Sequence, residues 1–195
     1  TAPIVYDVNG NLVYGSDGKP LRMVYNYDGL NYEFRGGDAI YEDVNHDGQI
    51  NSLDIVYLGN SNPKLSGGFG INFNYKRWAL KTNFNFRLGF KIINAARMQL
   101  EKMCNNYNQI TTVNLRWRKN GDITEIPRSL YGTSFYNWLG SDRYVEDGSF
   151  CRFQYLQLSY GLSPQMLKPL GLSSVRLACS ANNLFCWTGY TGTDP

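Results

Sequence analysis

The sequence has few of the patterns on which common functions depend. No apolar run approaches the roughly 18 residues of a membrane helix, which excludes helical spans but leaves a β-barrel open. His46 is the only histidine, so Ser-His, Cys-His and two-histidine metal chemistries are excluded. The number of carboxylates alone does not exclude a glycosidase that uses two of them, but nothing in the sequence points to such a catalytic pair. We therefore expect that the chain is not an enzyme and has no catalytic residues.

Cysteine and clustered charge are also scarce. The four cysteines form no C-x-x-C pair and no zinc spacing. Cys151 and Cys179 fall on apolar strand faces, where the role of a small hydrophobe is favoured over a disulfide. The net charge is +3 without a basic cluster, so no nucleic-acid partner is expected. The sequence does not begin with a signal peptide at Thr1, and we expect that the segment that directs export is missing or was removed.

What is present is a long alternation of apolar and polar residues. Period two over this length predicts a strand with one apolar and one polar, charged face. Ordinary strands have roughly 5–6 residues, whereas a tilted strand that crosses a bilayer needs about 9–11. The pattern is therefore typical of a membrane barrel, apolar outward and polar inward. Its apolar or nearly apolar positions are Trp78, Leu80, Thr82, Phe84, Phe86, Leu88 and Phe90.

A second alternating run lies just upstream and predicts a barrel hairpin over residues 65–90. Residues 69–75 alternate in the same way, and only Lys76-Arg77 separates the two runs. A connection of two residues predicts antiparallel pairing. Tyr75 and Trp78 flank the turn, where an aromatic girdle at the membrane boundary would fall. The alternative is one hairpin of a soluble β-sandwich whose outer face is covered by a second sheet.

A second hairpin is expected over residues 150–187. Cys151, Phe153 and Tyr155 share one face of its first strand, and then the phase changes, so that Leu156 and Leu158 share the next. A shift by one residue would turn side chains to the wrong face, so the change predicts a β-bulge near Tyr155 and Leu156.

The connections between these strands alternate in length. Barrels of the outer membrane keep short turns on the periplasmic side and long loops outside the cell. The long segments 1–64 and 91–149 are therefore expected to be extracellular, and 188–195 to begin the next such loop. Four strands cannot close a barrel, and an open edge is forbidden in lipid. The expected fold is all-β, an antiparallel transmembrane β-barrel fragment with long extracellular loops.

The sharpest chemical motif is residues 43–54, which follow the spacing of an EF-hand calcium loop. Gly48 stands where such a loop turns sharply, and the spacing offers the six to eight oxygens that Ca²⁺ takes. Asp54 replaces the usual glutamate, and no long helix precedes Asp43. The alternative is a polar Asp-Gly turn without metal. The expected ligands of a structural Ca²⁺ are Asp43, Asn45, Asp47, Gln49, Asn51 and Asp54.

An ordered set of short motifs resembles the SusC/RagA family of TonB-dependent outer-membrane transporters of Bacteroidetes. Any one motif is weak, but their order along the chain matches the C-terminal barrel of that family. The matching segments are Gly37-Asp38, 41–48, 58–64, 67–69, Arg116-Trp117, Gly121-Asp122, 126–128, 141–152, 158–160, 171–174, 182–185 and 190–192. The resemblance implies that this chain is a C-terminal fragment of such a barrel.

The resemblance also implies a function and partners. The full protein would import oligosaccharides or peptides across the outer membrane, surrounded by outer-membrane lipid. TonB would supply the energy through parts that lie outside this sequence, and a SusD-like surface lipoprotein would cover the entrance. The residues that contact substrate are not identified. The residues that would line the lumen or brace the plug are Lys81, Asn83, Asn85, Arg87, Arg152, Gln154 and Arg176.

Aromatic residues of the second long loop have two interpretations. Trp117, Tyr131, Tyr136 and Trp138 would stack on sugars or meet the lid, or they would pack within the loop. For the whole chain the rival hypothesis is a secreted, calcium-stabilised β-rich module that binds glycan or protein. It differs from the transporter hypothesis because it predicts a product that is soluble without detergent.

Overall fold

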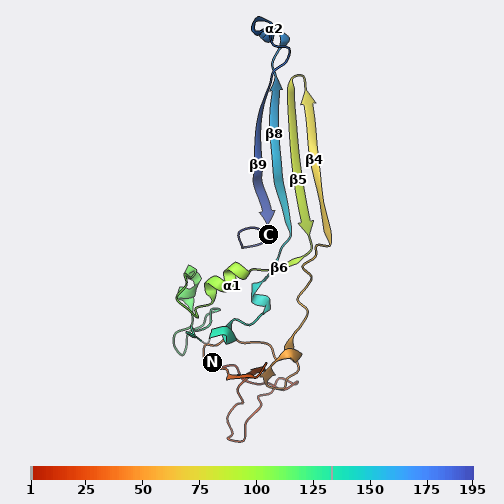
Figure 1. Cartoon of the computed structure of the whole chain (residues 1–195). Coiled ribbons are helices and arrows are strands. Elements are labelled where there is room, and N and C mark those ends of the chain that lie inside the picture. Colours follow the sequence, from red (N-terminus) through yellow and green to blue (C-terminus); the bar gives the residue numbers. More distant parts are fainter. Residues whose placement is uncertain (1, 133) are drawn as a thin grey trace. The chain divides into compact units, whose positions relative to one another are not determined.

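The computed structural model describes residues 2–132 and 134–195 and divides into two units (Figure 1). Residues Thr1 and Thr133, which belong to the expected segments 1–64 and 91–149, lie outside the described residues. We call the two parts the strand unit and the loop unit. The strand unit comprises Gly59–Ile93 and Val145–Pro195; the loop unit comprises Thr1–Leu58 and Asn94–Tyr144.

The strand unit is built on one antiparallel sheet of long strands. Its order is β4-β5-β8-β9, so β4 and β9 are the edges (Figure 1). Lys76 and Arg77 join β4 to β5, and Tyr75 pairs with Trp78 across this turn. The strands are β4 (Leu65–Tyr75), β5 (Trp78–Leu88), β8 (Phe150–Gly161) and β9 (Arg176–Thr188).

A β-bulge in β8 corrects the phase of its apolar residues. Phe153 pairs with Phe84 and Tyr155 with Asn83, so the extra residue on β8 is Gln154. The sequence predicted a bulge close by, but the grouping of Tyr155 with Phe153 was wrong. Because the bulge comes before Tyr155, that side chain lies opposite Asn83 on the polar face, and Leu156 continues the face of Phe153.

The register gives the sheet one apolar face. Residues opposite one another in a ladder share a face, and here rows of aromatic and aliphatic side chains face each other. Phe84 stacks between Phe69, at 4.8 Å between ring centroids, and Phe153, at 4.4 Å. Trp78 contacts Tyr160 near the turn, at 4.6 Å. Phe69 and Phe73 remain more than half exposed. This apolar face is therefore uncovered in the described chain.

Shorter elements complete the strand unit. β6 (Lys91–Ile93) pairs with β7 (Val145–Asp147), in a stretch that the sequence assigned to a long loop. Between β8 and β9 lie α2 (Pro164–Leu167) and η5 (Lys168–Leu170). Gly171 ends this helical pair with a left-handed φ of 68°, which glycine adopts without strain.

The loop unit contains short strands and helical turns. Its sheet has the order β2-β1-β3; β1 pairs antiparallel with β2 and parallel with β3, an exception to the antiparallel expectation. Among the described residues, no helix is both long and apolar enough to cross a membrane. The elements are β1 (Val24–Tyr27), β2 (Leu30–Glu33), β3 (Gln49–Ile50), η1 (Ser52–Asp54), α1 (Ala95–Glu101), η2 (Thr111–Leu115), η3 (Ser134–Asn137) and η4 (Asp142–Tyr144).

Two buried clusters hold the loop unit together. One forms around Phe34 and includes residues of β1, β3 and η3; the other forms around Trp138 and Tyr144. Both join segments that are far apart in sequence, so the long connections are folded rather than extended. The clusters are Met23, Tyr25, Phe34, Ile50 and Tyr136, and Met103, Val113, Ile126, Trp138 and Tyr144.

Candidate functional site

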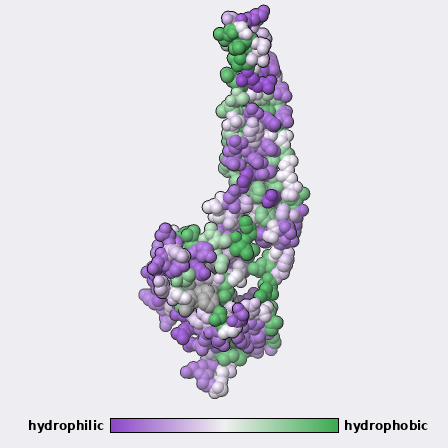
Figure 2. Space-filling model, in the orientation of Figure 1, coloured by the Kyte–Doolittle hydropathy of each residue, from purple (hydrophilic) through white to green (hydrophobic). Residues whose placement is uncertain are grey.

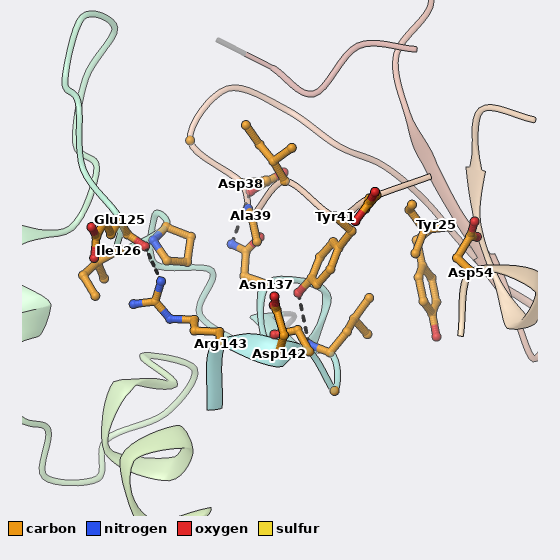
Figure 3. Close-up of a pocket in the computed structure, with 18 of the residues that line it drawn as sticks. Tyr25, Asp38, Ala39, Tyr41, Asp54, Glu125, Ile126, Asn137, Asp142 and Arg143 are labelled. Atoms are coloured by element: carbon orange, nitrogen blue, oxygen red, sulfur yellow. Dashed lines mark hydrogen bonds between the residues drawn. The ribbon is translucent and has the colours of Figure 1, made fainter. Parts of the chain in front are cut away.

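A recess of about 1100 Å³ lies within the loop unit (Figure 3). Residues from four stretches of the chain contribute to its wall, and its rim carries exposed apolar side chains such as Ile55 and Ile123. Its volume lies slightly above the roughly 300–1,000 Å³ that is usual for ligand pockets. The four stretches are 37–44, 50–58, 122–127 and 137–143, and Tyr25, Tyr27 and Trp117 also line the recess.

Asp38 is the centre of a hydrogen-bond network that shapes this wall. Its side chain is 0% exposed and pairs with Arg128, whose Nε lies 2.6 Å from Oδ1. The Tyr32 hydroxyl and the Arg35 backbone N–H donate to Oδ2, each at 2.8 Å. Burial alone would raise the pKa of Asp38, but these hydrogen bonds, above all that from Arg128, outweigh it and lower the pKa. The pair is therefore ionised at neutral pH and fixes residues 35–39.

Asn137 and Tyr41 attach η3 and the residues after it to this network. The Asn137 side chain accepts from the Ala39 N–H at 2.9 Å and donates to Asp38 and to the Arg128 carbonyl. The Tyr41 hydroxyl accepts from the Leu139 N–H at 3.1 Å (Figure 3). Apart from the bond to the Arg128 carbonyl, each of these bonds joins residues more than ninety positions apart in the sequence. The wall is therefore assembled from distant segments.

A second ionic cluster surrounds Glu101 and shares Arg143 with the lining of the recess. Glu101, 1% exposed, accepts hydrogen bonds from Arg97, Arg143 and the Tyr144 hydroxyl. Burial, followed by the charge of Glu101, raises the pKa of Tyr144, which therefore stays a donor. Arg143 also donates to the Glu125 carbonyl at 2.6 Å (Figure 3). This arginine thereby links the cluster around α1 to the recess.

The lining of the recess is acidic. Six carboxylates line it but only one basic side chain, Arg143. Glu42, Glu125 and Asp142 are exposed. In the described part of the chain no histidine or cysteine lines the recess, so its chemistry is that of hydrogen-bond acceptors rather than of a nucleophile with its base. The carboxylates are Asp38, Glu42, Asp54, Asp122, Glu125 and Asp142.

Three of the expected calcium ligands, Asp43, Asn45 and Asp47, lie on one hydrogen-bonded turn. Asp43 is buried and accepts from the N–H groups of Asp47 and Gly48, at 3.2 and 2.8 Å. The Asn45 amide donates to Asp47 at 2.9 Å. Gly48 has a φ of 82°, in the left-handed region that a sharp turn at this position requires.

The remaining expected ligands have protein partners of their own. Asp54 accepts from the N–H groups of Val44 and Asn51, at 2.9 and 2.8 Å, which closes the loop on itself. The Gln49 side chain accepts from Asn26 at 2.6 Å. Among the described residues, no group of three or more His, Cys, Asp or Glu side chains is placed to hold a metal ion. A calcium site here would depend on the Asn and backbone oxygens as well.

The four aromatic residues singled out in the sequence have different environments. Trp138 and Tyr136 are buried, each in one of the two clusters, in agreement with loop packing. Trp117 lines the recess, and its N–H donates no hydrogen bond in the structure. Tyr131 is exposed.

The expected lumen-lining residues share the polar face of the strand unit, with Gln154 at its bulge. Lys81 pairs with Gln157, Asn83 with Tyr155, and Asn85 with Arg152. Asn85 also donates to the Gln154 side chain at 3.2 Å. Figure 2 shows hydrophilic residues along the length of the strands on the face that it displays. The charged residues of these strands are all cationic: Lys81, Arg87, Arg152 and Arg176.

Known proteins similar in sequence are TonB-dependent receptors. No family model matches the chain. TonB-dependent receptors P3, P39 and P26 of Formosa agariphila are 30%, 31% and 28% identical to it, over 82%, 97% and 82% of its length. The chain spans only 15%, 18% and 16% of these relatives.

Solved structures of RagAB share the fold. A structure of the RagAB peptide transporter superposes with a TM-score of 0.57 at 25% identity, over 69% of this chain and 14% of the other. The RagAB peptide importer in its closed-closed state gives 0.60 at 20% identity, over 99% and 20%. The chain therefore matches a SusC/RagA-like fragment of a TonB-dependent receptor.

The likeness to RagAB in fold explains the open sheet. The four long strands are part of an antiparallel β-barrel wall, and the edges β4 and β9 are where further strands would pair. The relatives are receptors and importers, so the expectation that this chain is not an enzyme is confirmed.

Proposed function

We propose that this chain is the C-terminal part of an outer-membrane transporter that imports oligosaccharides or peptides with energy from TonB. The observation that carries the proposal is the uncovered apolar face of the long four-stranded sheet. Phe69, Ile71 and Phe73 are exposed on its edge strand, and alternating polar residues face the other way. A sheet of this kind is stable where lipid covers one face and water the other. The TonB-dependent relatives support the same proposal.

In this proposal the loop unit lies outside the cell and contributes to the substrate entrance. The fixed wall around Asp38 would hold the recess open, and the exposed carboxylates Glu42, Glu125 and Asp142 would accept hydrogen bonds from sugar hydroxyls or peptide amides. A SusD-like lipoprotein would cover this entrance. RagAB is a peptide importer; for this chain we propose that the cargo is either a peptide or an oligosaccharide.

Uptake by living cells tests the proposal. The gene that encodes this chain would be deleted and restored, and growth on single oligosaccharides or peptides would be compared in strains with and without TonB. We expect growth on at least one such nutrient to require both this gene and TonB. Normal growth of the deletion strain on every oligosaccharide and peptide that supports the parent would contradict the proposal.

We further propose that residues 43–54 bind a structural Ca²⁺. What supports this is a set of hard oxygen donors on one sharp turn, where Asp43 accepts from the Gly48 N–H and Asp54 accepts from the N–H of Val44, the residue after Asp43. Ca²⁺ would stabilise the loop beside β3. A calcium titration of the full protein, followed by protection of this segment from proteolysis, tests the idea. Equal cleavage with millimolar Ca²⁺ and with chelator would remove it; Asp43→Asn should lose any protection.

A further inference from the structure

A small recess on the polar face of the strand unit contains two arginines. It has a volume of about 440 Å³ and lies where β5 ends and β8 begins. Arg87 pairs with Phe150, and Arg152 lies two residues further along β8, so the two guanidinium groups are diagonal neighbours on the same face. The recess is lined by Ser66, Gly67, Asn85, Phe86, Arg87, Phe150, Arg152 and Pro195.

The charge of this recess is not balanced by its own strands. No carboxylate occurs in β4, β5, β8 or β9. The Arg87 side chain makes no hydrogen bond or ion pair with the described residues, although its backbone belongs to the sheet. Diagonal neighbours on one face of a sheet lie within reach of long side chains, so one anion can contact both guanidinium groups.

The partly used donors and acceptors of the recess also point to a ligand. Arg152 pairs with Asp194, but its Nε is buried without a partner, as is Oδ1 of Asn85. A guanidinium has five N–H donors in a fork that fits a carboxylate or a sulfate. Oδ1 of Asn85 requires a donor, such as a hydroxyl or an amide N–H next to the anionic group.

Asp194 shows that the Arg152 guanidinium accepts a carboxylate as its partner. It follows β9, and its side chain is 62% exposed although it pairs with Arg152. An exposed ion pair contributes little to stability, so a second carboxylate could displace it. Phe150 lies 5.1 Å beneath the Arg152 guanidinium and holds that group in place.

We propose that Arg87 and Arg152 bind an anionic group, a carboxylate or a sulfate, of the molecule that passes through the barrel. The inference rests on the proposed function, because it requires the polar face to line the lumen. It deepens that function by naming the charge of the cargo. Asp194 holds the site when no cargo is present.

Binding of matched probes to the full-length transporter tests this. The probes are a trigalacturonate and its methyl ester, and an acidic pentapeptide and its amidated form; the matched pair that shows a preference identifies the source of the anion. We expect the acidic member of at least one pair to bind roughly tenfold more tightly or better, from one or two charged hydrogen bonds. The variant R87Q/R152Q should lose that preference.

Two further variants separate this role from a structural one. K81Q/R176Q removes the same charge from the same face away from the recess and should keep the preference. D194N removes the competing carboxylate and should strengthen binding of the acidic probe. The inference would be overturned if the parent did not prefer the acidic probe. It would also be overturned if K81Q/R176Q lost this preference as fully as R87Q/R152Q, or if R87Q/R152Q kept it. Weaker acidic binding in D194N would overturn it as well.

The outcomes distinguish this inference from the proposed function. Equal binding of the acidic and neutral members of both pairs overturns the inference alone, since transport of a neutral cargo would still stand. If none of the four probes binds and no oligosaccharide or peptide depends on the gene for uptake, both fail.

Discussion

Removal of Arg128 should loosen the wall of the acidic recess. Asp38 is fully buried and Arg128 is 25% exposed. Arg128→Met would leave the Asp38 carboxylate with donors only from Tyr32, Arg35 and Asn137. Breaking a buried ion pair by removing one partner costs about 3–5 kcal/mol. Because three donors remain, we expect about 3 kcal/mol, which corresponds to a change in the local opening equilibrium of roughly a hundredfold.

Hydrogen exchange of the full-length transporter measures this change. Peptides that cover residues 35–41 and 126–139 should exchange roughly a hundredfold faster in R128M than in the parent. The control is R22M, which removes an arginine from the exposed pair with Glu33 in the same unit; it should cost at most about 1 kcal/mol. Exchange in R128M no faster than in R22M would refute the assignment of Asp38 as the centre of the wall.

The remaining predictions concern pH, lipid contact and the turn at Gly48. The pKa of Asp38 is lowered below its ordinary 3.8; its stabilisation should be complete above about pH 4 and lost as pH falls through the folded-state pKa, which exchange at decreasing pH would detect. Phe84→Arg should cost about 2–4 kcal/mol and reduce folded barrel on unboiled gels, whereas Asn83→Arg on the polar face should be tolerated; equal effects would contradict the face assignment. Gly48→Ala should destabilise its turn by more than about 1 kcal/mol, because φ is 82° and the new Cβ lies 3.2 Å from Val5. Gly18 has open space around it, so Gly18→Ala should speed hydrogen exchange only through the cost of a left-handed φ. A larger effect than that of Gly48→Ala would refute this.

The sequence predicted the strand unit well because its signal is local. Period-two alternation and the two residues Lys76-Arg77 suffice to place β4 opposite β5. The bulge was located less well, since its position depends on which residue of β8 the neighbouring strands leave unpaired. Gln154 gives no separate signal in one sequence; the pairing of Phe153 with Phe84 determines it.

The recess was not predicted, because its wall depends on contacts between distant residues. Asp38 and Arg128 are 90 residues apart. Both belong to segments that carry the resemblance to the SusC/RagA family, but a single sequence does not show that they meet. The pairing of a buried aspartate with an arginine, which is always charged, is visible only in the folded chain. The same is true of Glu101 and Tyr144, which are 43 residues apart.

Fractionation of the source cells would show whether this chain is part of a larger barrel in the outer membrane. An antibody against this segment would be used to blot outer-membrane and soluble fractions, with boiled and unboiled samples compared. We expect a heat-modifiable band in the outer membrane, far larger than the 22.2 kDa of this chain. A soluble band near 22.2 kDa that heating does not shift would contradict it and favour the secreted β-rich module.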